Sequence, residues 1–138
     1  MIREFSAGGV VVRGMQGRAF VAVVRVREEI LALPKGHPDG GESAAAAARR
    51  EVREETGVEA ELVEKLGDIR YWYARDGERV MKIVSFFLFR YRSGSLADHD
   101  HEVEEALWIP LEEAPVRLAY KGEREMAESA LSRLAEGR

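Results

Sequence analysis

The sequence contains no cysteine, and this absence excludes several classes of protein. Disulfide scaffolds, thiolate zinc sites and cysteine nucleophiles all need a thiol. No apolar run approaches the roughly 20 residues that span a bilayer, and the first residues lack the apolar stretch of a signal peptide. We therefore expect a soluble cytoplasmic protein with no membrane partner.

A large excess of positive charge is also lacking. The 21 Lys and Arg residues are outnumbered by 25 Asp and Glu residues, which gives a formal net charge of −4. A broad basic face for duplex nucleic acid is therefore not expected, and we predict no stable nucleic-acid partner. An acidic protein can still bind a polyanion where metal ions or a local basic cluster bridge the charges.

The 138 residues, 46% of them hydrophobic, suit one domain near the commonest size. No repeat or long linker divides the chain, so we treat residues 1–138 as a single domain, and a monomer and a homodimer both remain open. β-branched and aromatic patterning predicts strands at 6–12, 19–26, 30–33, 62–73, 79–91 and 106–109.

Helical signals occur in two places. Ser43 is a plausible N-cap for a helix that ends at Thr56, where Gly57 supplies the stop. From Glu123 onward, apolar residues recur at helical spacing. Strands mixed with helices predict an α/β layered domain, in which the doubly apolar run 83–89 forms a central strand.

A glycine-rich loop at residues 35–41 precedes the first helix, and three carboxylates follow on that helix. Glu51, Glu54 and Glu55 share one helical face, where like charges oppose one another. Oxygen-only ligands of this kind suit Mg²⁺ or Mn²⁺. Taken alone, however, this pattern is more often a solvated acidic helix end, with Arg50 in ordinary ion pairs.

The loop and the carboxylates together are far more specific, because they resemble the Nudix box Gly-x5-Glu-x7-Arg-Glu-U-x-Glu-Glu-x-Gly-U, with U apolar. A chance match of seven fixed letters has a probability on the order of one in a billion. The matching residues are Gly36, Glu42, Arg50, Glu51, Val52, Glu54, Glu55, Gly57 and Val58.

Resemblance to the Nudix family implies an α/β/α sandwich with a mixed β-sheet, in which the box forms a loop-helix-loop. It implies a hydrolase of nucleoside diphosphates linked to another moiety, with Mg²⁺ or Mn²⁺ as the cofactor. By position, Glu51 and Glu55 correspond to metal ligands, Glu54 to a further ligand or the base, and the Gly36 carbonyl to an inner ligand.

Two further roles follow from the same resemblance. Glu42 corresponds to the structural partner of Arg50. Many relatives place a glutamate six residues before a Trp as a metal ligand or general base, and Glu102 has this spacing to Trp108. The neighbouring carboxylates of Glu104 and Glu105 compete for this assignment, and the polar run 98–102 is equally compatible with a solvent-exposed loop.

Substrate-binding residues are suggested by weaker likenesses. Residues 33–37, Leu-Pro-Lys-Gly-His, resemble the entry to the box in diadenosine polyphosphate hydrolases, where Lys35 and His37 would face phosphate. Lys82 could also meet phosphate, although it is equally compatible with an exposed strand cation. The turn at Tyr120 resembles one in which an aromatic ring closes over a base.

The run Tyr71-Trp72-Tyr73 fits an aromatic platform for a purine, and we assign Tyr73 to substrate binding. Tyr71 and Tyr73 share one strand face and Trp72 the other, so only one set can readily line a site. The simpler interpretation is that the two tyrosines cover the core.

The leading hypothesis is a hydrolase of dinucleoside polyphosphates such as diadenosine tetraphosphate, in which water attacks a phosphorus. Alternatives are a (d)NTP or 8-oxo-dGTP pyrophosphohydrolase, an RNA 5′-pyrophosphohydrolase and, least favoured because all the box carboxylates are present, a non-catalytic nucleotide sensor. Nudix enzymes of the ADP-ribose type usually carry a distinctive proline well beyond the box. No proline lies between Val58 and Pro110, so this class is less favoured.

Glu54→Gln is expected to lower turnover by orders of magnitude without unfolding the protein, because the change is nearly isosteric at an expected exposed position. Steady-state kinetics with circular dichroism checks both parts. Turnover at the wild-type rate would remove Glu54 from the mechanism.

Overall fold

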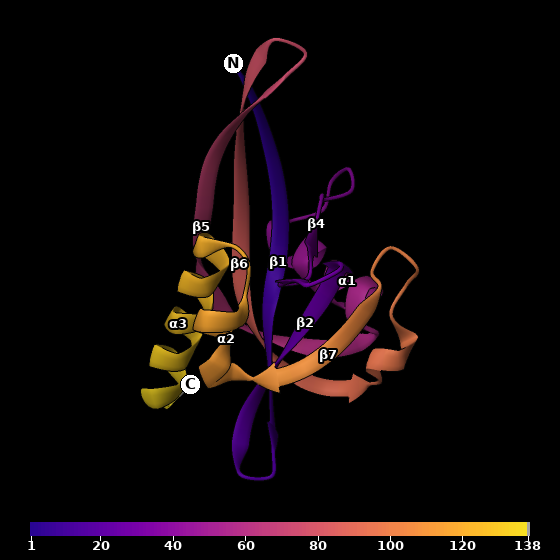
Figure 1. Ribbon diagram of the computed structural model, residues 1–138, viewed down its shortest axis with the longest axis vertical. Helices are drawn as coiled ribbons and strands as arrows, with labels where there is room; N and C mark the ends of the chain where they lie inside the picture. The colour runs from indigo at the N-terminus through magenta and orange to yellow at the C-terminus, as the bar shows by residue number, and fades with distance from the viewer. Residues whose placement is uncertain (138) are drawn as a thin grey trace.

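A computed structural model describes residues 1–137 as strands wrapped by helices on two sides (Figure 1). Its elements are β1 (Ile2–Met15), β2 (Arg18–Arg27), β3 (Ile30–Ala32), β4 (Lys35–Gly36), α1 (Ala44–Thr56), β5 (Val58–Arg75), β6 (Glu78–Gly94), η1 (Leu96–Asp98), β7 (Glu105–Pro110), η2 (Leu111–Glu113), α2 (Ala114–Arg117) and α3 (Lys121–Ala135). Within this part of the chain, none of the helices has the length and apolar character needed to cross a bilayer.

The sheet is mixed. β1 runs parallel to β6, whereas β5 pairs antiparallel with β6 and β2 pairs antiparallel with β1, β3 and β7. β6 therefore lies between β1 and β5, which confirms that the apolar run 83–89 is central. The turn at Asp76 and Gly77, both with positive φ, joins β5 to β6 in the long hairpin beside the N-terminus in Figure 1.

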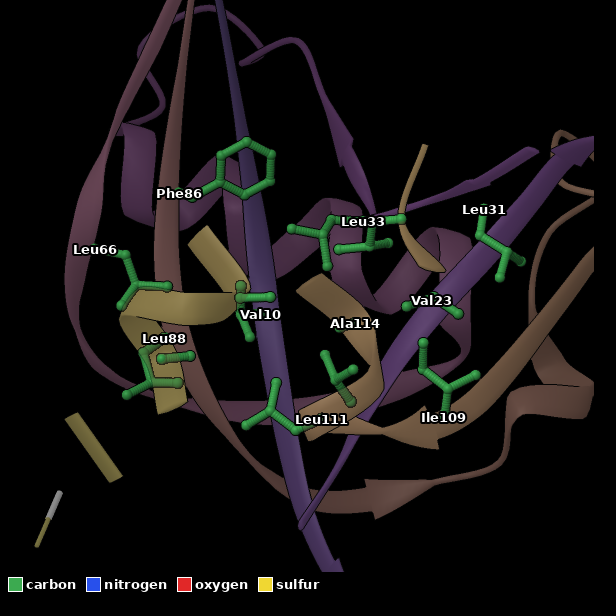
Figure 2. Close-up of a cluster of buried hydrophobic side chains, with 14 of the residues drawn as sticks. Val10, Val23, Leu31, Leu33, Leu66, Phe86, Leu88, Ile109, Leu111 and Ala114 are labelled. Carbon is green, nitrogen blue, oxygen red and sulfur yellow. The ribbon is translucent and has the colours of Figure 1, made fainter. Parts of the chain in front are cut away.

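Alternating residues of the central strands build a core on each face of the sheet. Val10 and Phe86 face the core covered by α2 and α3, which Figure 2 shows, whereas Val11 and Phe89 pack against α1. Because helices cover both faces of a mixed sheet, the fold is the expected α/β/α sandwich.

All six predicted strands are present, and five are longer than expected. The predicted bounds are too short because the apolar pattern stops at the polar residues near the strand ends, whereas the backbone hydrogen bonding continues through them. The helix predicted from Glu123 likewise begins earlier, at Lys121. The loop predicted over residues 35–41 needs a correction, because Lys35–Gly36 pairs with β1 as the short strand β4, while Gly41 has a φ of 83°.

α1 forms as its termini predict. The Ser43 hydroxyl accepts a hydrogen bond from the Ala46 N–H at 3.1 Å. Gly57 ends the helix in the left-handed conformation, with a φ of 76°. The box carboxylates therefore lie on the last two turns of a helix whose length and ends are set locally.

β4 lies directly against β1, and glycine makes this approach possible. The Gly9 N–H donates to the Pro34 carbonyl at 3.1 Å. A Cβ atom at Gly8 would lie 2.5 Å from that same carbonyl oxygen and 2.8 Å from the Phe86 ring. The segment that leads into the box is thereby held on the central strand.

Gly8→Ala is expected to lower the free energy of unfolding by roughly 1–3 kcal/mol, because a backbone oxygen must move to admit the methyl group. Urea denaturation measures the change. Gly14→Ala on the same strand is the matched control, since a Cβ there meets nothing within 4 Å. Equal stability of the two variants would contradict the close approach of β1 and β4.

Candidate active site

Arg50 ties the glycine-rich loop to α1. Its Nε and Nη2 donate to the two carboxylate oxygens of Glu42 at 2.9 and 3.0 Å, and Nη2 also donates to the His37 carbonyl at 2.8 Å. Glu42 in turn accepts from the Asp39 N–H at 2.8 Å. The expected pairing of Arg50 with Glu42 is thus present, and the hydrogen bonds from Arg50 hold the pKa of Glu42 below its ordinary value.

The same guanidinium also binds two of the three carboxylates on the α1 face. Its Nη1 donates to Glu51 at 2.8 Å and to Glu54 at 3.1 Å. The Glu51 side chain is only 13% exposed, whereas that of Glu54 is 43% exposed. Glu51 is therefore the inner member of the pair and Glu54 the outer one.

Glu51 lies against the backbone of Gly36. An added Cβ at Gly36 would come within 1.5 Å of the Glu51 Oε2, so no side chain fits between them. Burial raises the pKa of Glu51 to about 7, and a hydrogen bond with Glu54 acts in the same direction, outweighing the attraction of Arg50. Glycine is required here because the carboxylate occupies the space of its side chain.

Glu55 is the second partly buried carboxylate of the box. It accepts a hydrogen bond from the Lys35 N–H at 3.1 Å. Burial raises its pKa to about 7, and the negative charges of Glu51 and Asp100 add to this effect. Two neighbouring carboxylates that resist ionisation are a poor arrangement for stability alone.

In residues 1–137, no three acidic or histidine side chains are gathered closely enough to hold a metal ion as they stand. Arg50 is bound between Glu51 and Glu54 instead. The donor set nevertheless fits a hard divalent cation, since the partly buried Glu51 and Glu55 flank the Gly36 backbone and supply oxygen ligands only.

A cavity of about 500 Å³ brings most of the predicted site residues together. Lys82 reaches it from β6, and burial lowers the pKa of its ammonium group. Of the three candidate carboxylates before Trp108, Glu102 lines the cavity, whereas Glu105 pairs with Arg25. The lining residues from the predicted set are Lys35, Gly36, His37, Arg50, Glu51, Glu55, Lys82 and Glu102.

His37 is oriented by the N-terminal part of β1. Its Nδ1–H donates to the Phe5 carbonyl at 3.1 Å, and Nδ1 also lies 3.4 Å from the Ser6 hydroxyl. This leaves Nε2 as the ring nitrogen not engaged by these contacts. The imidazole therefore lies at the rim of the cavity rather than in a core.

The loop before β7 packs on the end of α1. The Asp100 N–H donates to the Glu54 carbonyl at 2.8 Å, and the Asp100 carboxylate accepts from the Glu102 N–H at 3.1 Å. The sequence left a solvent-exposed loop and a functional segment equally open for residues 98–102, and Asp98, His101 and Glu102 are exposed. Asp100 nevertheless fixes Glu102 relative to the box helix, a role that no pattern in the sequence signals.

A second cavity, of about 630 Å³, adjoins the first and shares Lys35, Tyr71 and Val84 with it. Tyr71 and Tyr120, each about half exposed, lie at its sides, and Phe86 is part of its apolar lining. One cavity thus carries carboxylates and lysines, while the other offers aromatic rings.

Tyr73 lines neither cavity. Its hydroxyl donates to Glu4, which also pairs with Arg75 at 2.6 Å, and the hydrogen bond to Glu4 raises the pKa of Tyr73. The structure therefore brings Tyr71, the neighbour two residues before it on the same face, to the position that the sequence analysis assigned to Tyr73. The binding role of Tyr73 stays a prediction.

Comparison with known proteins identifies a family. A family model described as NUDIX domain matches residues 3–130. The chain is 45% identical over 136 residues to "Putative mutator protein MutT4" of Mycobacterium tuberculosis, covering 94% of this chain and 55% of that protein. It is 35% identical over 107 residues to an 8-oxo-(d)GTP phosphatase of Mycolicibacterium smegmatis, covering 77% of this chain and 32% of that protein. The match thus spans about half of one curated relative and a third of the other.

Solved structures show the same fold at low identity. A C. elegans Ap4A hydrolase in a binary complex aligns with a TM-score of 0.74 at 22% identity, covering 96% of this chain and 98% of that one. A NUDIX hydrolase from Nitrosomonas europaea aligns with a TM-score of 0.72 at 20% identity, covering 95% and 90%.

Glu55→Gln is expected to stabilise the metal-free protein at high pH. The pKa of Glu55 is raised from 4.5 to about 7, so the folded chain keeps a proton that the unfolded chain releases in this window, and stability falls as the pH rises through it. The glutamine can still accept from the Lys35 N–H. We expect the variant to exceed the wild type by roughly 1–3 kcal/mol at pH 8.

Urea denaturation in EDTA, repeated from pH 4 to pH 8, measures this difference. The two curves should meet near pH 4, where the Glu55 carboxyl of the wild type is largely protonated in both the folded and the unfolded chain. Parallel curves across the whole range would contradict the raised pKa of Glu55.

Proposed function

Because this chain belongs to the NUDIX domain family, we propose that it is a metal-dependent hydrolase of nucleoside polyphosphates, with residues 1–138 as its catalytic domain. The observation that carries the proposal is the pair of adjoining cavities that share Lys35, Tyr71 and Val84. The first has groups for a metal and phosphates, and the second has a size and lining suited to a base.

The carboxylates of Glu51 and Glu55 and the carbonyl of Gly36 would hold Mg²⁺ or Mn²⁺. When bound, such an ion neutralises phosphate charge and lowers the pKa of an attacking water. The raised pKa values of Glu51 and Glu55 support this assignment, because two partly buried carboxylates with incomplete compensation favour a cation beside them.

Protons and phosphates would be handled by the residues around these ligands. Glu102 lines the cavity, and Glu54 is 43% exposed beside Arg50, which also lines it, so we take either as the group that would accept a proton from water. Lys35, Lys82 and His37 would bind phosphate oxygens, since all three line the cavity. The base would lie between the rings of Tyr71 and Tyr120, where stacking contributes ~1–3 kcal/mol.

We infer that a nucleoside triphosphate, including an oxidised purine such as 8-oxo-dGTP, is the substrate class. The relatives at 45% and 35% identity are named a mutator protein and an 8-oxo-(d)GTP phosphatase, and both alignments cover most of this chain. Identity of 35% or more over most of the chain supports substrate class better than a shared fold at 22% identity.

Dinucleoside polyphosphates are the second candidate. They are favoured by the Leu-Pro-Lys-Gly-His entry to the box and by the half-exposed rings of Tyr71 and Tyr120 beside the lysines. The sequence analysis placed this class first, and the named relatives reverse the order.

A Mg²⁺-dependent hydrolysis panel with product identification tests both classes. It compares dGTP, 8-oxo-dGTP, diadenosine tetraphosphate, ADP-ribose and triphosphorylated RNA. We expect the fastest release of a nucleoside monophosphate and pyrophosphate from the triphosphates, with loss of turnover in EDTA and in Glu51→Gln. Faster cleavage of diadenosine tetraphosphate to ATP would select the second candidate.

No turnover of any compound, with nucleotide binding retained, would overturn the hydrolase proposal and leave a nucleotide sensor. The substitution Glu128→Gln on α3 is the matched control, since it removes one exposed carboxylate that lines neither cavity. It should keep the wild-type rate.

A further inference from the structure

Glu123, in the first turn of α3, is buried beside the proposed phosphate site. Its side chain is only 4% exposed, which is unusual for a carboxylate. One oxygen accepts a hydrogen bond from the Leu33 N–H at 2.7 Å, and the other pairs with the Lys35 ammonium at 2.9 Å. A segment 90 residues away is thus bound through two contacts.

The carboxylate does not serve its own helix. Glu123 is the third residue of α3, where an acidic side chain commonly reaches back to cap the N-terminal N–H groups. The N-cap residue Tyr120 has no side-chain cap, and Glu123 turns away to Leu33 and Lys35 instead.

Backbone contacts hold this end of α3 firmly. The Ala119 N–H donates to the Leu31 carbonyl at 3.0 Å. A Cβ atom at Gly122 would lie 2.6 Å from the Ile69 side chain, so α3 sits directly on β5. The position of the Glu123 carboxylate is therefore fixed by the fold, and the flexible Lys35 side chain adapts to it.

Lys35 lies where the two cavities meet. Besides Glu123, its ammonium donates to the Leu33 carbonyl at 3.3 Å and lies 5.6 Å from the centre of the Tyr120 ring. An ammonium group has three donors, so these two bonds leave one for a ligand. Lys35 is among the lining residues of both cavities.

We propose that Glu123 is a positioning residue, which holds the Lys35 ammonium at the junction of the two cavities so that its remaining N–H meets a phosphate next to the base. The inference rests on the proposed function for the identity of the ligand. It adds to that function a link between the phosphate-binding Lys35 ammonium and the first turn of α3, which follows Tyr120.

A double-mutant cycle on ligand affinity tests the proposal. The probe is a methylene-bridged, non-hydrolysable analogue of dGTP with Mg²⁺, titrated by calorimetry into the wild type, Glu123→Gln, Lys35→Met and the double variant. Gln keeps one oxygen as the acceptor for the Leu33 N–H and replaces the oxygen that pairs with Lys35 by an NH2 donor, which removes the charge and this hydrogen bond. We expect about tenfold weaker binding in each single variant, since one charged hydrogen bond is lost, and no further loss in the double variant.

Additive losses would overturn the proposal, because Glu123 would then act on binding through the fold or through Tyr120. Unchanged binding in Lys35→Met would also overturn the proposal. This variant keeps the hydrogen bond from the Leu33 N–H to Glu123, so it still tests the proposal if Glu123→Gln folds poorly. Glu128→Gln on the same helix controls for the change of charge and should bind as the wild type does.

The cycle stays separate from the hydrolase proposal. A wild-type protein that binds the analogue but cleaves no nucleotide would refute the proposed function, and the cycle would still decide the role of Glu123. A wild-type protein that does not bind the analogue would overturn the positioning role itself.

Discussion

The arrangement of the site depends on one guanidinium group. Arg50 donates to the carboxylates of Glu42, Glu51 and Glu54 and to the His37 carbonyl. Its planar fork of donors can satisfy several acceptors at once, which a lysine could not do. The loop and the helix are therefore one unit, because a single cation holds three carboxylates together.

The two carboxylates of this unit that are hardest to ionise are the ones that we propose as metal ligands. Burial opposes ionisation of Glu51 and Glu55, while Glu42 on the loop side of Arg50 is well compensated. Burying an ionisable carboxylate lowers the free energy of unfolding, and proteins tolerate this loss at functional sites when the rest of the fold offsets it. The tight contact of β1 with β4 at Gly8 is part of this support, because it holds Gly36 beside Glu51.

Features set by local sequence were predictable. The cap at Ser43, the stop at Gly57 and the turn at Asp76 depend on residues within a few positions, and the central strand follows from an apolar run. Glu123 was not predictable, because its burial depends on contacts with Leu33, 90 residues away. The same holds for Tyr71: sequence alternation puts Tyr71 and Tyr73 on one face, but the position of α3 along β5 decides which tyrosine meets a cavity.

The charges of the site come in opposed pairs supplied by distant segments. Lys35 is paired with Glu123, and Lys82 lies 3.9 Å from Glu4, which also accepts from Tyr73. Each lysine thus has a carboxylate that orients it and reduces the cost of burying it. Pairing also limits the net positive charge of the cavity, so under the proposed function the lysines alone would not supply the affinity for a polyphosphate. The divalent cation proposed at Glu51 and Glu55 would add the positive charge that is still needed.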